Sequence, residues 1–198
     1  MLRHPPYALA LALILLAIGA RGNGPRPHAV SPRDARATPV LQTYTDAVHG
    51  YTLRYPRTWT LKTGVPTTSF HAGLDALTPF AVVFASADTD AGLIAVAGRG
   101  TYSRARIIQT ETRVLKASPG ETRQGSIVFG SRVIDGVVFR EARATFKTRA
   151  GAVGGRVLMA TRRGFTYFFV VVLTPSGARA AADRAEAQAI VGSIVVRP

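Results

Sequence analysis

The sequence predicts an α+β fold in which an antiparallel β-sheet is followed by a helix. Between residues 126 and 173, runs of β-branched and aromatic residues are separated by short glycine-containing breaks, a pattern typical of strands joined by tight turns. One break consists only of Asp135-Gly136, a pair that supplies the positive φ angles of a two-residue hairpin turn. After the last run, Thr174-Pro175-Ser176 precedes an alanine-rich segment, which is a signal for the start of a helix.

The composition fits a globular domain with a strong positive charge. The 198 residues include 25 Lys and Arg but only 11 Asp and Glu, for a formal net charge of +14. Hydrophobic residues make up 47% of the chain, which excludes an intrinsically disordered protein. The absence of cysteine excludes disulfide scaffolds, thiolate zinc sites, iron–sulfur clusters and cysteine nucleophiles.

The N-terminal segment has the pattern of an export signal. Arg3 and His4 precede an apolar stretch at residues 8–20, which as a helix would extend about 20 Å, less than the hydrocarbon core of about 30 Å. We expect cleavage after Ala20, or after Gly19, and an uncleaved membrane anchor is the alternative. Residues 21–43 hold four prolines and four arginines and are predicted to be an extended linker. The folded domain is then residues 44–198, outside the cytoplasm.

The first half of this domain is predicted to contain two strand pairs and one helix. Residues 44–48 and 51–55 form short strands joined at His49-Gly50, and Trp59 is expected to close one end of the core. Residues 62–78 are predicted to be a loop with one helical turn. Residues 80–87 and 92–97 form a hairpin. Residues 103–117 fit both a helix and a strand, and we favour a helix.

The second half is predicted in more detail. With Asp135-Gly136 as the loop, the hairpin register pairs Ile134 with Val137, Arg132 with Phe139 and Gly130 with Glu141. A third strand covers residues 153–161. Residues 165–173 are apolar on both faces, which predicts a central strand. In the following helix, which ends at Gly192, the alanines that repeat at spacings of 3 and 4 are expected to face the sheet: Ala178, Ala182, Ala185 and Ala189. Residues 193–197 form a last extended piece.

Two segments resemble the PsbP-like family. Residues 50–59 (GYTLRYPRTW) resemble a strand of this family that ends in Tyr-Pro and is followed by Trp. Residues 164–171 and 190–194 resemble the family's Gly-x-x-Tyr strand and the end of its last helix with the closing segment. Ile194 replaces the usual Phe, Arg163-Gly164 replaces Asp-Gly or Asn-Gly, and residues 62–125 match only in layout. The resemblance implies an antiparallel sheet sandwiched between helices. It also implies protein docking, since this family includes extrinsic photosystem II subunits, a nuclear-import factor that binds a small GTPase, and exported bacterial proteins.

Candidate catalytic and metal-binding residues are few. His49 with Asp46, or His71 with Asp75, could orient a base for a serine nucleophile, but no serine lies in a G-x-S-x-G motif. A metal site would need His71, Asp75 and a further carboxylate such as Asp88 or Asp90. The Gly98-x-Gly100 segment is predicted to be a tight turn rather than a dinucleotide-binding loop, because no parallel βαβ unit surrounds it. We therefore expect no catalytic residues, cofactor or metal.

The arginines suggest a binding surface. We predict a basic surface formed by residues of neighbouring strands and turns: Arg104, Arg106, Arg113, Arg143, Lys147, Arg156, Arg162 and Arg163. This charge could simply be solvated, could face an acidic protein or anionic envelope surface, or could bind nucleic acid. Nucleic acid is not favoured, because the aromatic residues are expected to be buried.

These observations favour an exported, non-enzymatic accessory protein that docks a basic surface onto a membrane-associated complex or an acidic envelope partner. A binder of anionic lipid or of an envelope polymer is the alternative. A hydrolase or metal-dependent enzyme is the third hypothesis.

Overall fold

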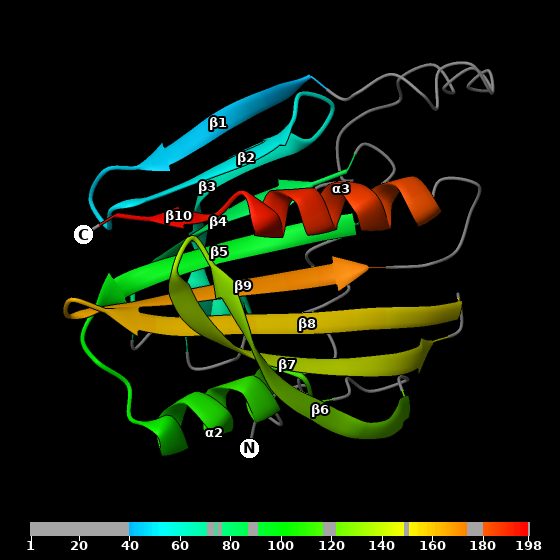
Figure 1. Cartoon of the computed structure of the whole chain (residues 1–198). Coiled ribbons are helices and arrows are strands. Elements are labelled where there is room, and N and C mark those ends of the chain that lie inside the picture. The colour runs from blue at the N-terminus through cyan, green and yellow to red at the C-terminus, as the bar shows by residue number, and fades with distance from the viewer. Residues whose placement is uncertain are drawn as a thin grey trace, which may run out of the picture.

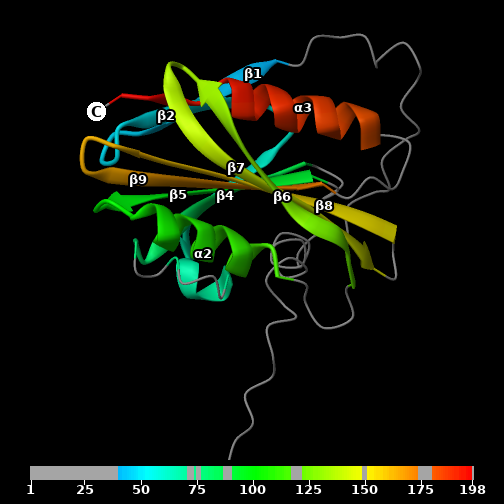
Figure 2. The same ribbon diagram turned by 60° about the horizontal axis from the view of Figure 1, so that its bottom comes forward.

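The structure, a computed structural model, describes residues 40–70, 74, 77–86, 91–116, 122–148, 151–173 and 180–197. The predicted leader, most of the predicted linker and the predicted helix start at 174–176 lie outside these residues. Within these residues, two antiparallel sheets and two α-helices form a layered α+β structure (Figure 1). Helix α2 (Arg104–Val114) covers one face of the larger sheet, and α3 (Ala180–Gly192) and the smaller sheet cover the other (Figure 2). The predicted fold class is confirmed.

The smaller sheet joins segments from opposite ends of the described chain. Its order is β1-β2-β10, with β1 at Leu41–Asp46, β2 at Tyr51–Pro56 and β10 at Val195–Val196. The predicted strand pair around His49-Gly50 is therefore present. It begins earlier than the sequence predicts, because residues 41–43, which the sequence places in the linker, already pair with β2.

The larger sheet has seven strands in the order β3-β4-β5-β9-β8-β7-β6. Their bounds are Thr60–Pro66 for β3, Phe80–Ala85 for β4, Ala91–Arg99 for β5, Thr122–Ile134 for β6, Val137–Thr148 for β7, Gly151–Arg162 for β8 and Phe165–Leu173 for β9. The predicted register of the β6–β7 hairpin is confirmed, with Asp135 and Gly136 at φ values of 49° and 71°. The predicted central position of β9 is also confirmed, since β9 lies between β5 and β8.

One strand was missed. Residues 60–66 form β3, which pairs with β4, whereas the sequence predicted a loop from residue 62. The register shifts between Lys62 and Val65, and Gly64 has a φ of 69°. This irregularity removes the alternation of apolar and polar residues by which a strand is identified. The predicted helical turn is present as the 3-10 helix Thr67–Phe70.

The helix that we favoured at residues 103–117 is confirmed as α2. The hydroxyl of Ser103 accepts a hydrogen bond from the backbone N of Arg106 at 3.3 Å and so caps the first turn. None of the helices in the described part of the chain is long and apolar enough to span a membrane.

The packing face predicted for α3 is wrong. Ala182, Ala185 and Ala189 are exposed, and Ala178 lies outside the described residues. The helix instead buries the face that carries Asp183, Ala187, Ile190 and Val191. Ile190 and Val191 remove more apolar surface from water than alanines do, and they decide which side of the helix faces the sheet.

The sheet separates two hydrophobic clusters. The cluster on the α3 side includes Tyr51, Trp59, Phe139, Phe169 and Ile190. Trp59 is thus buried, as predicted. The cluster on the α2 side includes Ile107, Leu115, Phe146, Phe168 and Val170. Both faces of the central strands are covered, so exposed side chains on the outer strands β6 and β7 stand out as candidates for binding.

Candidate functional site

The residues of the predicted basic surface lie in three places. Arg104, Arg106 and Arg113 belong to α2, and the guanidinium of Arg106 lies 4.1 Å from the ring centroid of Tyr102. On the opposite face of the sheet, strand alternation places Arg143, Lys147 and Arg156 on the side of α3. At the other end of β8, Arg162 donates to the backbone oxygen of Val196 at 2.9 Å, and Arg163 occupies the β8–β9 turn with a φ of 48°.

A compact polar group lies between strands β6–β8 and α3, and we call it the arginine cluster: Arg132, Glu141, Arg143, Arg156 and Gln188. Arg156 is its centre. Its Nε lies 3.0 Å from Oε1 of Glu141, and its NH1 donates to Oε1 of Gln188 at 2.7 Å. Arg132 donates to the same Gln188 oxygen at 3.2 Å, and Nε of Arg143 lies 3.7 Å from Oε2 of Glu141.

The surroundings of Arg156 disfavour its positive charge. Its side chain is only 19% exposed. Burial lowers the pKa of Arg156, Glu141 opposes this change, and the neighbouring Arg143 and Arg132 lower the pKa further. The basic surface predicted from the sequence includes Arg143 and Arg156 but not Arg132, Glu141 or Gln188. The predicted hairpin register pairs Arg132 with Phe139 and so could have placed Arg132 on the same face as Arg143. The position of Gln188 could not be predicted, because it depends on how α3 packs.

The opposite face of the same hairpin exposes apolar side chains, and we call it the apolar patch: Phe129, Val133 and Val138. Val133 and Val138 are cross-strand partners and are 66% and 63% exposed, and Phe129 is 45% exposed. Among the described strands, β6 is at the end of the sheet and pairs with β7 alone. An exposed edge strand with apolar side chains is a surface on which another protein can pair or pack.

A buried carboxylate lies under α2. The side chain of Glu111 is fully buried, and its Oε2 is 3.7 Å from NH2 of Arg140 on β7. Burial raises the pKa of Glu111, and Arg140 opposes the rise. Arg140 therefore interacts with α2 on the face opposite the arginine cluster.

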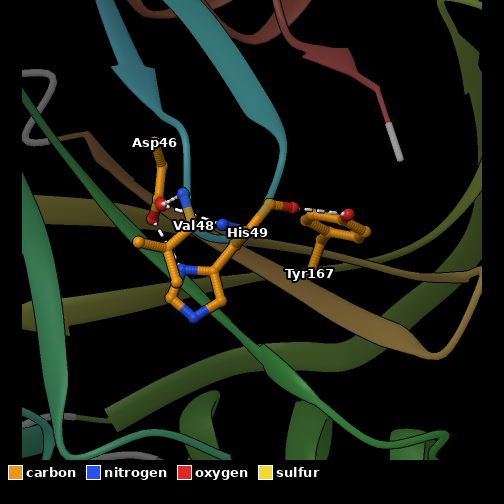
Figure 3. Close-up of polar contacts among 4 residues, drawn as sticks. All are labelled: Asp46, Val48, His49 and Tyr167. Carbon is orange, nitrogen blue, oxygen red and sulfur yellow. Dashed lines mark hydrogen bonds and ion pairs between the residues drawn. The ribbon is translucent and has the colours of Figure 1, made fainter.

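The predicted pair of His49 and Asp46 is formed, but it belongs to a turn (Figure 3). Nδ1 of His49 lies 2.8 Å from Oδ2 of Asp46, while Oδ1 accepts the backbone N–H groups of Val48 and His49 at 3.1 and 3.0 Å. The hydroxyl of Tyr167 donates to the His49 carbonyl at 2.8 Å. Within the described residues these two side chains hydrogen-bond to no serine. Their hydrogen bonds stabilise the β1–β2 turn, and the bond from Tyr167 to the His49 carbonyl connects this turn to β9.

Other candidates from the sequence have a structural role or lie outside the described residues. His71, Asp75, Asp88 and Asp90 are outside them. The described part of the chain contains no group of three His, Asp or Glu side chains that could hold a metal ion. Around Gly98, the sheet is antiparallel, and a Cβ atom at this position would collide with the backbone oxygen of Leu77. This glycine is therefore required by close packing.

Comparisons with known proteins show the fold. No family model and no curated protein matches the chain. The solution structure of cyanobacterial PsbP from Synechocystis sp. PCC 6803 has a TM-score of 0.56 and 19% identity, and the match covers 88% of this chain and 100% of that one. Two structures are more distant. LpqN, involved in cell envelope biogenesis of Mycobacterium tuberculosis, has a TM-score of 0.45 and 14% identity, and the match covers 80% of this chain and 92% of that one. The Saccharomyces cerevisiae Ran-binding protein Mog1p has a TM-score of 0.41 and 10% identity, and the match covers 80% of this chain and 96% of that one. The antiparallel sheet between helices and the likeness to cyanobacterial PsbP together show that this chain has the PsbP-like fold.

Proposed function

We propose that this protein is an exported, non-catalytic accessory protein that docks onto a protein partner at the cell envelope. The β6–β7 hairpin is the docking surface. The observation that carries the proposal is the apolar patch, because Val133 and Val138 form an exposed cross-strand pair beside an open strand edge. A partner that covers this pair removes its apolar surface from water, which favours association.

The charge around the patch indicates the character of the partner. On the face of the patch the hairpin carries Arg123 and Arg140, because Arg123 pairs with Phe146 of the α2-side cluster and Arg140 lies two residues from Val138. Arg123 is exposed. Apolar and aromatic side chains bordered by arginine are typical of protein interfaces. Opposite charge speeds association, so the partner is an acidic protein or an acidic part of a membrane-associated complex.

Three further considerations support this role. The PsbP-like fold agrees with the family that the sequence resembles, and protein docking is what that resemblance implies. Export rests on the basic and apolar pattern of residues 1–20. A non-catalytic role is supported by the His49–Asp46 pair, whose hydrogen bonds stabilise a turn.

Site-specific photocrosslinking tests the docking surface. A photoreactive amino acid is placed at Val133 or Val138 of the full-length protein in its own cells. The matched control is Phe80 of β4, which is also apolar and is 57% exposed. We expect a discrete crosslinked protein from positions 133 and 138 and none from position 80. Equal crosslinking from all three positions, or none from the hairpin, would contradict the proposal.

A further inference from the structure

We propose that the arginine cluster is a binding site for a phosphomonoester group, held between strands β6–β8 and α3. This inference goes beyond the docking role, because it uses the face of the hairpin opposite the apolar patch. It concerns a ligand group and not a protein surface.

The first argument is the imbalance of charge and hydrogen-bonding capacity. Three guanidinium groups surround one carboxylate, so the cluster has three positive charges and one negative charge. Each guanidinium has five N–H donors, yet the structure gives the three of them four contacts in total, with Glu141 and Gln188. Donors therefore remain for a further acceptor.

The second argument is the position of these charges. Arg156 is mostly buried between its neighbours, whereas the side chain of Arg143 is 52% exposed. Charges close together and partly shielded from water repel more strongly than on an open surface. An anion that enters from the exposed side at Arg143 would offset this repulsion.

The third argument is that the α3 residue in contact with the cluster is neutral. Gln188 faces the cluster, and its neutral side-chain oxygen accepts from both Arg132 and Arg156. Glu186 lies on the other flank of the helix, where its carboxylate accepts the indole N–H of Trp59 at 2.6 Å. The arginines come from adjacent strands and not from a loop, so the site is held in position before a ligand binds.

The ligand class follows from these features. A phosphomonoester near neutral pH carries close to two negative charges, which balances the net charge of the cluster. Its oxygens can accept pairs of N–H donors from more than one guanidinium, and arginine is suited to this geometry.

The test is a titration of the purified protein with inorganic phosphate. Binding is measured by the change in Tm on thermal unfolding and by the ³¹P line width of the phosphate. We expect a saturable increase in Tm of about 3 °C at saturating phosphate. Arg143→Gln and Arg132→Gln should each weaken phosphate binding at least tenfold. Arg104→Gln removes an exposed charge on α2, away from the cluster, and should leave binding unchanged.

Three results would overturn the proposal: no saturable binding, unchanged binding in both cluster variants, or an equal loss in Arg104→Gln, which would mean that only the net charge matters. Because Arg143 and Arg132 retain partial exposure, their glutamine variants are expected to fold, and the Tm without phosphate checks this.

Vesicles distinguish a free phosphomonoester from a lipid headgroup. Vesicles with phosphatidic acid present a monoester phosphate, and vesicles with phosphatidylserine present a carboxylate and a diester. Stronger binding to phosphatidic acid, lost in Arg143→Gln, would support a lipid source. Phosphate binding without vesicle binding would support a soluble source. Crosslinking from Val133 tests the docking role independently, so either proposal can fail alone.

Discussion

The indole Nε1 of Trp59 lies 2.6 Å from Oε2 of Glu186 and so connects the turn after β2 to α3, 127 residues later in the chain. Trp59 is 4% exposed and belongs to the cluster on the α3 side of the sheet. Its ring fills the core, while its single N–H donor has a charged acceptor within reach. A partly buried hydrogen bond of this kind contributes more to stability than a neutral one on the surface.

Replacement of Trp59 by Phe should therefore lower the free energy of unfolding by about 3 kcal/mol, from the lost hydrogen bond and the smaller ring. Glu186→Gln keeps an oxygen acceptor for the indole and should cost clearly less. Urea unfolding followed by circular dichroism measures both. If the two variants are equally destabilised, the hydrogen bond from Trp59 is not what Glu186 contributes.

Removal of the Asp46 carboxylate should loosen the β1–β2 turn. Asp46→Ala leaves the backbone N–H groups of Val48 and His49 without their acceptor and should cost about 1–2 kcal/mol. Asp46→Asn retains the oxygen that accepts these two groups and should cost less. Amide hydrogen exchange at Val48 and His49 locates the effect. Unchanged exchange at these two amides in Asp46→Ala would contradict this account of the turn.

Two adjacent glycines of β8 should respond differently to alanine. A Cβ atom at Gly155 would lie 2.9 Å from Cδ2 of Leu115 and 3.4 Å from Cε2 of Phe146, so Gly155→Ala should lower the free energy of unfolding by about 1–3 kcal/mol through overpacking. At Gly154 the nearest atom would be 3.8 Å away. Gly154→Ala should be neutral, or stabilising by up to about 1 kcal/mol. Thermal unfolding of the two variants gives the comparison, and similar Tm values would count against the packing of α2 described above.

Glu111 should make stability depend on pH. Burial raises the pKa of Glu111 above the ordinary value of 4.5. The Glu111 carboxyl group therefore binds a proton more tightly in the folded protein than in the unfolded chain. The contribution of the proton to stability is fully present below pH 4.5 and is lost as the pH rises through the folded-state pKa. The stability of Glu111→Gln relative to the wild type should therefore increase over this window and then become constant. Urea unfolding of both proteins from about pH 4 to about pH 8 checks this, and a constant difference would mean that Glu111 does not titrate abnormally.

Features determined by local sequence could be predicted. Asp135-Gly136 fixes both the turn and the register of β6 with β7, because a two-residue loop leaves one pairing. The uninterrupted apolar run in β9 indicates a strand covered on both sides. The apolar pattern of residues 103–117 fits both a helix and a strand, and the cap at Ser103, which acts within one turn, stabilises the helix.

Features determined by packing could not be predicted in the same way. Strand β3 contains a bulge at Gly64 and depends on pairing with β4, a partner that the local pattern does not reveal. The buried face of α3 is set by where Ile190 and Val191 meet the sheet. The arginine cluster depends on both local sequence and packing. Strand pairing places Arg143 beside Arg156, whereas the packing of α3 places Gln188 next to Arg156.

The three-stranded sheet can form completely only late in synthesis. Val195 and Val196 of β10 pair with Thr52 and Tyr51 of β2. One edge of β2 therefore stays unpaired until nearly all of the described chain has left the ribosome. Contacts between such distant residues form late, because a long loop must close first. The growing chain therefore remains incompletely folded through most of its translation. For the export proposed above, this delay is an advantage, because an early stable fold would have to be undone before transport.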